Sequence, residues 1–195
     1  MRYIYAIILL LFSIINLDAQ EQKQSQDLYQ GGNTATLGFD TNFSKTTYKP
    51  KGLGAESEFI DFRLNASPGY YLGDQLVLIM DIGIHFSKQD RFTGETKNIN
   101  AIFGPVARYY FDGEPIAPFI SAGYLFERGK NDGTKTKGNY ISLGCGGSFM
   151  VGNNIALEAE LNYNFGPYED RYNMVVVDYK YRQTLLRIGA RYFFE

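Results

Sequence analysis

The sequence has one cysteine, one histidine and no tryptophan among its 195 residues. A single cysteine excludes an internal disulfide framework, and the alternation around Cys145 favours an apolar wall residue over a reactive thiol. A formal net charge of -2 provides no basic footprint for nucleic acid. No metal-ligand spacing, phosphate-binding loop or recognised catalytic motif occurs in the sequence. We therefore expect no cofactor, no metal site, no nucleic-acid partner and no enzymatic activity.

Long apolar runs are missing beyond the N-terminus. Residues 1–19 have the features of a secretory signal peptide: Arg2, an apolar run over 4–15 that is too short for a membrane helix, and a cleavage site after about Ala19. A retained N-terminal anchor is the alternative interpretation. The polar residues 20–32 are expected to form a flexible periplasmic leader, and residues 33–195 one domain.

Aromatic residues and glycine are abundant, with Tyr 16, Phe 15 and Gly 21. The final stretch of the chain alternates strictly. Leu186, Ile188, Ala190, Tyr192 and Phe194 occupy one side, and Arg187, Gly189 and Arg191 the other. Because successive strand residues point to opposite faces, this pattern predicts a strand with one apolar face. Similar alternation predicts seven earlier strands, at about 33–44, 57–72, 76–87, 98–111, 116–128, 139–151 and 155–165.

The connections between these strands alternate in length. Tight turns are predicted at 73–74, 112–115 and 152–154, and loops of about ten residues or more at 45–56, 88–97, 129–138 and 166–179. We therefore predict an all-β fold, an eight-stranded antiparallel up-and-down transmembrane β-barrel in the cell outer membrane, with both termini in the periplasm. Pro105, inside the fourth strand, and Pro118, early in the fifth, predict a bulge or a break.

A soluble lipocalin-like barrel would show the same alternation with its apolar face turned inward. The signal peptide and two aromatic girdles favour the membrane-spanning barrel. The predicted girdle near the turns comprises Tyr70, Tyr109, Phe111, Phe149, Tyr192 and Phe194. The predicted girdle near the loops comprises Phe43, Phe86, Tyr124, Phe126, Tyr163 and Phe165.

Charged residues share the face opposite the apolar one and are expected inside the barrel. They are Asp40, Asp61, Arg63, Asp81, His85, Arg108, Glu127, Glu158, Glu160, Arg187 and Arg191. An eight-stranded barrel is just wide enough to be filled by side chains, so we expect a salt-bridge network that plugs the lumen. A narrow or gated ion path is the alternative. Catalytic roles for the Glu158–Glu160 spacing or for His85 with Ser87 are disfavoured against structural charge pairing.

Three stretches of the chain, 64–74, 103–111 and 187–194, resemble the small outer-membrane β-barrel domain family of Gram-negative bacteria, the OmpA/OmpX-type eight-stranded barrels. The resemblance covers nearly the whole mature chain. It implies that Arg187, Gly189, Tyr192 and Phe194 form the signal for barrel assembly, although Glu195 follows the terminal aromatic. It also implies contact with the barrel assembly machinery, with outer-membrane lipid and with lipopolysaccharide. The peptidoglycan-binding domain of larger relatives is expected to be absent.

The function expected from these features is structural or interactive. Loops on a rigid scaffold usually carry binding, so an extracellular protein or ligand is expected to contact loops 45–56 and 166–179. The hydrophobic residues 175–177 could instead extend the flanking strands. A small porin with a narrow charged lumen is the second hypothesis, and a lipid-modifying outer-membrane enzyme is the third.

Overall fold

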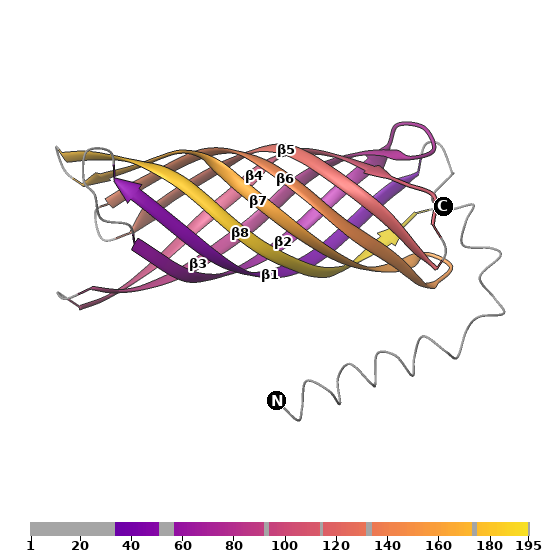
Figure 1. Cartoon of the computed structure of the whole chain (residues 1–195), viewed down its shortest axis with the longest axis horizontal. Coiled ribbons are helices and arrows are strands. Elements are labelled where there is room, and N and C mark those ends of the chain that lie inside the picture. Colours follow the sequence, from indigo (N-terminus) through magenta and orange to yellow (C-terminus); the bar gives the residue numbers. More distant parts are fainter. Residues whose placement is uncertain are drawn as a thin grey trace, which may run out of the picture.

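The computed structural model describes residues 34–50, 57–91, 94–113, 115–131, 134–172 and 175–194. Eight strands account for almost all of them (Figure 1). These are β1 (Ala35–Pro50), β2 (Ser57–Tyr71), β3 (Leu76–Arg91), β4 (Gly94–Tyr110), β5 (Ile116–Asn131), β6 (Thr134–Gly152), β7 (Ile155–Tyr172) and β8 (Val175–Phe193). Within the described ranges, no helix is long and apolar enough to cross a membrane. The predicted signal peptide and leader lie outside the described residues.

The strands form a closed barrel in which each strand pairs antiparallel with its neighbours in sequence. β8 closes the barrel against β1, from Thr36 opposite Phe193 to Pro50 opposite Tyr179. The predicted eight-stranded up-and-down topology is therefore confirmed. At one end the connections are tight. Gly73 has a φ of 90°, a left-handed conformation that glycine adopts without steric cost, and it allows the short turn between β2 and β3.

The wall of the barrel turns its apolar side chains outward. Phe39, Phe43 and Ile188 are 60%, 64% and 55% exposed, whereas the alternating residues between such positions face the interior. A soluble barrel would bury these side chains. The lipocalin-like alternative is therefore wrong, and the exposed apolar band fits a lipid environment.

The predicted ends of the strands are wrong at the end of the barrel opposite the termini. β1 continues to Pro50, β3 to Arg91 and β7 to Tyr172, so most residues of the predicted loops 45–56, 88–97, 129–138 and 166–179 are strand. The strands alternate less clearly there because polar residues occupy both faces, yet backbone pairing continues, for example between Lys88 and Lys97. Residues 175–177 extend β8, as the alternative interpretation allowed.

The break predicted at Pro105 is also wrong. β4 runs through this residue, and its pairing with β5 resumes without a change of register: Phe103 lies opposite Phe126 and Val106 opposite Gly123. The ladder omits only the intervening pairs, while on the other side Pro105 lies opposite Met80 of β3. Since a strand residue directs its N–H toward one neighbour only, proline interrupts one ladder and leaves the other intact.

Pro68 and Pro167 repeat this arrangement. Pairing of β2 with β3 and of β6 with β7 is omitted at these two residues, again with no shift of register. Each remains opposite a partner on its other side, Leu37 for Pro68 and Lys180 for Pro167. The bulge predicted at Pro118 is likewise absent, because Pro118 lies in regular register opposite Gly147 of β6.

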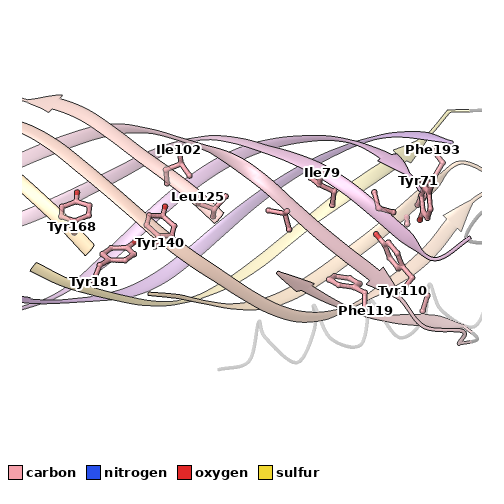
Figure 2. Close-up of a cluster of buried hydrophobic side chains, with 14 residues drawn as sticks. Tyr71, Ile79, Ile102, Tyr110, Phe119, Leu125, Tyr140, Tyr168, Tyr181 and Phe193 are labelled. Atoms are coloured by element: carbon pink, nitrogen blue, oxygen red, sulfur yellow. The ribbon is translucent and has the colours of Figure 1, made fainter. Parts of the chain in front are cut away.

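The inside of the barrel contains two groups of aromatic side chains at different heights (Figure 2). Near the turns, Tyr110 packs on Phe119 with ring centroids 5.3 Å apart, and Tyr71 lies 6.2 Å from Phe193. Toward the other end, Tyr181 stacks between Tyr140 and Tyr168, with ring centroids 5.0 and 5.5 Å away. Buried polar and charged side chains occupy much of the remaining inward face.

Candidate functional site

The eleven charged residues predicted for the lumen lie on the inward face of the wall. Their shared position follows from strand parity, because most of them alternate with exposed apolar neighbours. The structure brings them together in three layers, of which the two nearer the turns are connected through Arg187 and Glu160. Six of them are carboxylates, four are guanidiniums and one is an imidazole: Asp40, Asp61, Asp81, Glu127, Glu158 and Glu160; Arg63, Arg108, Arg187 and Arg191; and His85.

The layer nearest the turns is a chain of alternating charges. Arg108 from β4 donates to Glu158 at 2.7 Å and to Glu160 at 2.8 Å, both on β7. Arg191 from β8 lies 3.1 Å from the other oxygen of Glu158, to which Tyr110 also donates at 2.7 Å. The spacing of the two glutamates therefore serves a salt-bridge ladder. Buried charges require this pairing, since an isolated charge in a low-dielectric interior is costly.

The middle layer centres on Arg187 of β8. Its guanidinium binds Asp40 of β1 at 2.6 Å and Asp81 of β3 at 2.9 Å, with two hydrogen bonds to each carboxylate. Asn65 of β2 donates a further hydrogen bond to Asp40 at 2.6 Å. Arg187 also lies 3.9 Å from Glu160, which connects this layer to the one below. One arginine thereby ties four of the eight strands together across the lumen.

The third layer surrounds His85 of β3, which is 1% exposed. Its Nδ1 lies 2.8 Å from Glu127 of β5, and its Nε2 lies 3.4 Å from Asp61 of β2. Nδ1 is thus within hydrogen-bond distance of Glu127, whereas Nε2 faces Asp61 without forming a hydrogen bond. Asn100 donates to Glu127 at 2.6 Å, and Tyr140 donates to it at 3.4 Å. His85 therefore lies buried between two carboxylates from neighbouring parts of the wall.

Arg63 of β2 extends this layer toward the aromatic group of Tyr140, Tyr168 and Tyr181. It donates to Gln183 of β8 at 2.6 Å and to the hydroxyl of Tyr181 at 3.1 Å. Gln183 in turn donates to Ser44 and Thr46 of β1 at 2.9 and 2.8 Å. The Arg63 guanidinium thus donates to neutral side chains, and its Nε has no hydrogen-bond partner among the described residues.

Selection by charge missed these neutral members of the network. Asn65, Asn100, Tyr110, Tyr140, Tyr181 and Gln183 accept from or donate to the charged residues. All of them except Tyr140 lie an even number of positions from a predicted lumen charge on the same strand, and this spacing could have placed them on the inward face. Tyr181 and Gln183 were harder to find because they lie beyond the predicted loop 166–179, in a part of β8 that the apolar alternation did not cover.

The predicted assembly signal lies at the end of β8. Arg187 faces the lumen, while Tyr192 and Phe194 are exposed on the outer wall with their rings 4.9 Å apart. Gly189 has an independent packing reason to be glycine, because an added Cβ would overlap the carbonyl oxygen of Phe39. The role of these residues in assembly stays a prediction, and Glu195 lies outside the described residues.

In the part of the chain that the structure describes, no group of three or more histidine, cysteine, aspartate or glutamate side chains could hold a metal ion. The side chain of Ser87 lies outside the described side chains, so its predicted proximity to His85 is untested. The described lumen is filled by a network of charged and neutral polar side chains together with buried aliphatic and aromatic ones.

These features define a class of protein, the small membrane-spanning β-barrel with an apolar outer wall and a polar, filled interior. The chain matches the outer membrane protein beta-barrel domain over residues 7–194 and belongs to this family. No curated protein matches it in sequence.

Solved structures of other outer membrane proteins share the fold. Neisserial surface protein A is 21% identical, with 84% of this chain and 100% of that chain covered and a TM-score of 0.59. The outer membrane protein AlkL is 16% identical over 85% and 92% of the two chains, with a TM-score of 0.59. OprG from Pseudomonas aeruginosa is 12% identical over 85% and 97%, with a TM-score of 0.55. At these identities the similarity concerns the fold alone.

Proposed function

We propose that the protein is a non-enzymatic outer-membrane barrel that is closed to solutes and acts at the cell surface through its long hairpin ends. The filled lumen carries this proposal. Five side chains inside the barrel are each at most 1% exposed: Glu127, Tyr140 and Tyr181 toward the hairpin ends, and Tyr71 and Phe193 near the turns. A water-filled path would leave such side chains accessible to solvent. The charged side chains between them bind one another or, in the case of Arg63, neutral neighbours, and therefore do not line an open pore.

The surface role is supported by the length of the strands beyond the apolar band. β7 and β8 remain paired as far as Tyr172 opposite Val175, and Val176 at this end is 48% exposed. A paired sheet that projects from the membrane holds a binding surface more rigidly than separate loops would. The predicted partner regions 45–56 and 166–179 lie largely on such projecting strands, so an extracellular protein or ligand would meet strand surfaces as well as the connections between them.

Single-channel recording in planar bilayers tests the proposal. We expect the refolded barrel, verified by its heat-modifiable mobility on gels, to insert without stable conductance steps. A double variant, Arg187→Ala with Arg191→Ala, removes two of the side chains that cross the lumen and provides the comparison for a partly emptied barrel. Stable steps from the unmodified protein would overturn the closed lumen and favour the small porin.

A further inference from the structure

Four basic side chains meet on the outward face of the β5–β6 hairpin, beyond the apolar band. Arg128 of β5 lies directly opposite Lys137 of β6, and Lys130 lies opposite Lys135. Lys130, Lys135 and Lys137 are exposed, and Arg128 is partly buried. We call these four residues the basic patch. On the far side of β6, Lys135 also lies opposite Arg171 of β7, which extends the same charge by one strand.

Over the residues that the structure describes, the basic patch has no negatively charged partner. Like charges directly opposite each other on neighbouring strands are destabilising. Among the described side chains, no carboxylate forms an ion pair with any of the four residues, whereas the lumen arginines Arg108, Arg187 and Arg191 are all paired with acids. The nearest candidate, Glu169, lies opposite Lys137 but forms its ion pair with Arg171 at 3.3 Å.

The position of Arg128 fixes the height of the basic patch relative to the membrane. Its guanidinium lies along the outer wall, where it donates at 2.7 Å to the carbonyl oxygens of Glu127 and Gly138 and at 2.9 Å to the Asn139 side chain. Its Cζ lies 5.7 Å from the ring centroid of Phe126, a residue of the predicted aromatic girdle near the loops. The positive charge therefore begins two residues above the aromatic boundary, at the level of lipid headgroups.

We propose that the basic patch binds the phosphate groups of a glycolipid headgroup in the outer leaflet. Paired cations at the membrane surface suit a multiply charged phosphate, and each basic residue near an anionic membrane surface adds to the attraction. A bound phosphate would relieve the repulsion between the opposed lysines, so the lipid would stabilise the β5–β6 hairpin. The assignment rests on the proposed orientation, with the hairpin ends outside the cell, but not on whether the lumen is closed.

The test measures binding of lipid A that carries two phosphates to the refolded full-length mature barrel in detergent micelles, by native mass spectrometry. Lipid A without phosphates is the matched probe. We expect the variant Lys130→Gln with Lys137→Gln to bind bisphosphorylated lipid A about tenfold more weakly than the unmodified protein. The charge-retaining variant Lys130→Arg with Lys137→Arg should bind within about twofold of it. Lys180→Gln with Arg182→Gln removes the same charge from β8 and should also change binding by less than about twofold.

Three results would overturn the proposal. Equal binding of lipid A with and without phosphates would exclude phosphate recognition. An equal loss in the β8 variant would reduce the effect to overall charge. Binding of a soluble sulfated oligosaccharide at the basic patch, with no retention of lipid A, would assign the patch to a polyanion outside the membrane. Conductance and heat-modifiable mobility are measured separately, so a failure here is distinguishable from a failure of the closed-lumen proposal.

Discussion

Arg187 of β8 and Asp81 of β3 are bound to each other across the lumen, with Nη1–Oδ2 and Nη2–Oδ1 distances of 2.9 and 3.0 Å. They are 106 positions apart in sequence and lie on strands that are not neighbours in the barrel wall. The pair therefore acts as a strut between opposite parts of the wall. Backbone ladders connect only adjacent strands, so struts of this kind determine how firmly the barrel resists flattening.

Replacement of Arg187 should destabilise the barrel strongly. In Arg187→Gln, Asp40 and Asp81 lose their shared cation and become buried, uncompensated charges, for which the expected cost is about 3–5 kcal/mol. The measurement is the urea dependence of the gel-mobility shift in detergent. Arg182→Gln on the same strand is the control, because Arg182 is exposed, and it should change stability by less than about 0.5 kcal/mol. Equal stability of the two variants would contradict a stabilising role for the Arg187–Asp81 ion pair.

His85 should prove structural rather than catalytic. His85→Gln removes the ring nitrogens that lie 2.8 Å from Glu127 and 3.4 Å from Asp61, so we expect a loss of about 1.5–3 kcal/mol in unfolding free energy. The same variant, expressed in cells, should leave the acyl composition of outer-membrane lipid unchanged. An altered lipid profile at normal barrel levels would revive the hypothesis of a lipid-modifying enzyme.

The sequence was sufficient for the faces of the strands but not for their ends or their partners. Alternation placed Arg187 and Asp81 inside because side-chain direction depends only on parity. Which strands face one another across the lumen depends on the stagger of all eight, and alternation does not contain it. The predicted ends were wrong because Lys88 and Lys97 belong to polar stretches without apolar alternation, although their backbones are paired. The break predicted at Pro105 was wrong because the N–H group that proline lacks would have pointed toward only one of the two neighbouring strands.

A close backbone approach makes glycine necessary at position 104. A Cβ there would overlap the carbonyl oxygen of Tyr124, and this oxygen belongs to the wall itself rather than to a flexible side chain. We expect Gly104→Ala to destabilise the folded barrel by about 1–3 kcal/mol through forced backbone displacement. Gly152→Ala is the matched control, because a Cβ at that position meets no atom within 4 Å. Both are measured by unfolding in urea, and an unaffected Gly104→Ala would show that β4 and β5 separate there at little cost.

Amide hydrogen exchange tests the correction of the predicted loop 166–179. β7 pairs with β6 and with β8 as far as Tyr172, so its amides from Gly166 onward are hydrogen-bonded on one side or the other. We expect them to exchange slowly, apart from that of Pro167, which has no N–H, and to resemble the amide of Leu161 within the apolar band. Asn153 in the tight turn is the reference for fast exchange. If residues 168–172 exchange as fast as Asn153, the strands end at the membrane and the projecting sheet does not persist in solution. The surface proposed for partner binding would then consist of loops, as the alternation alone had indicated.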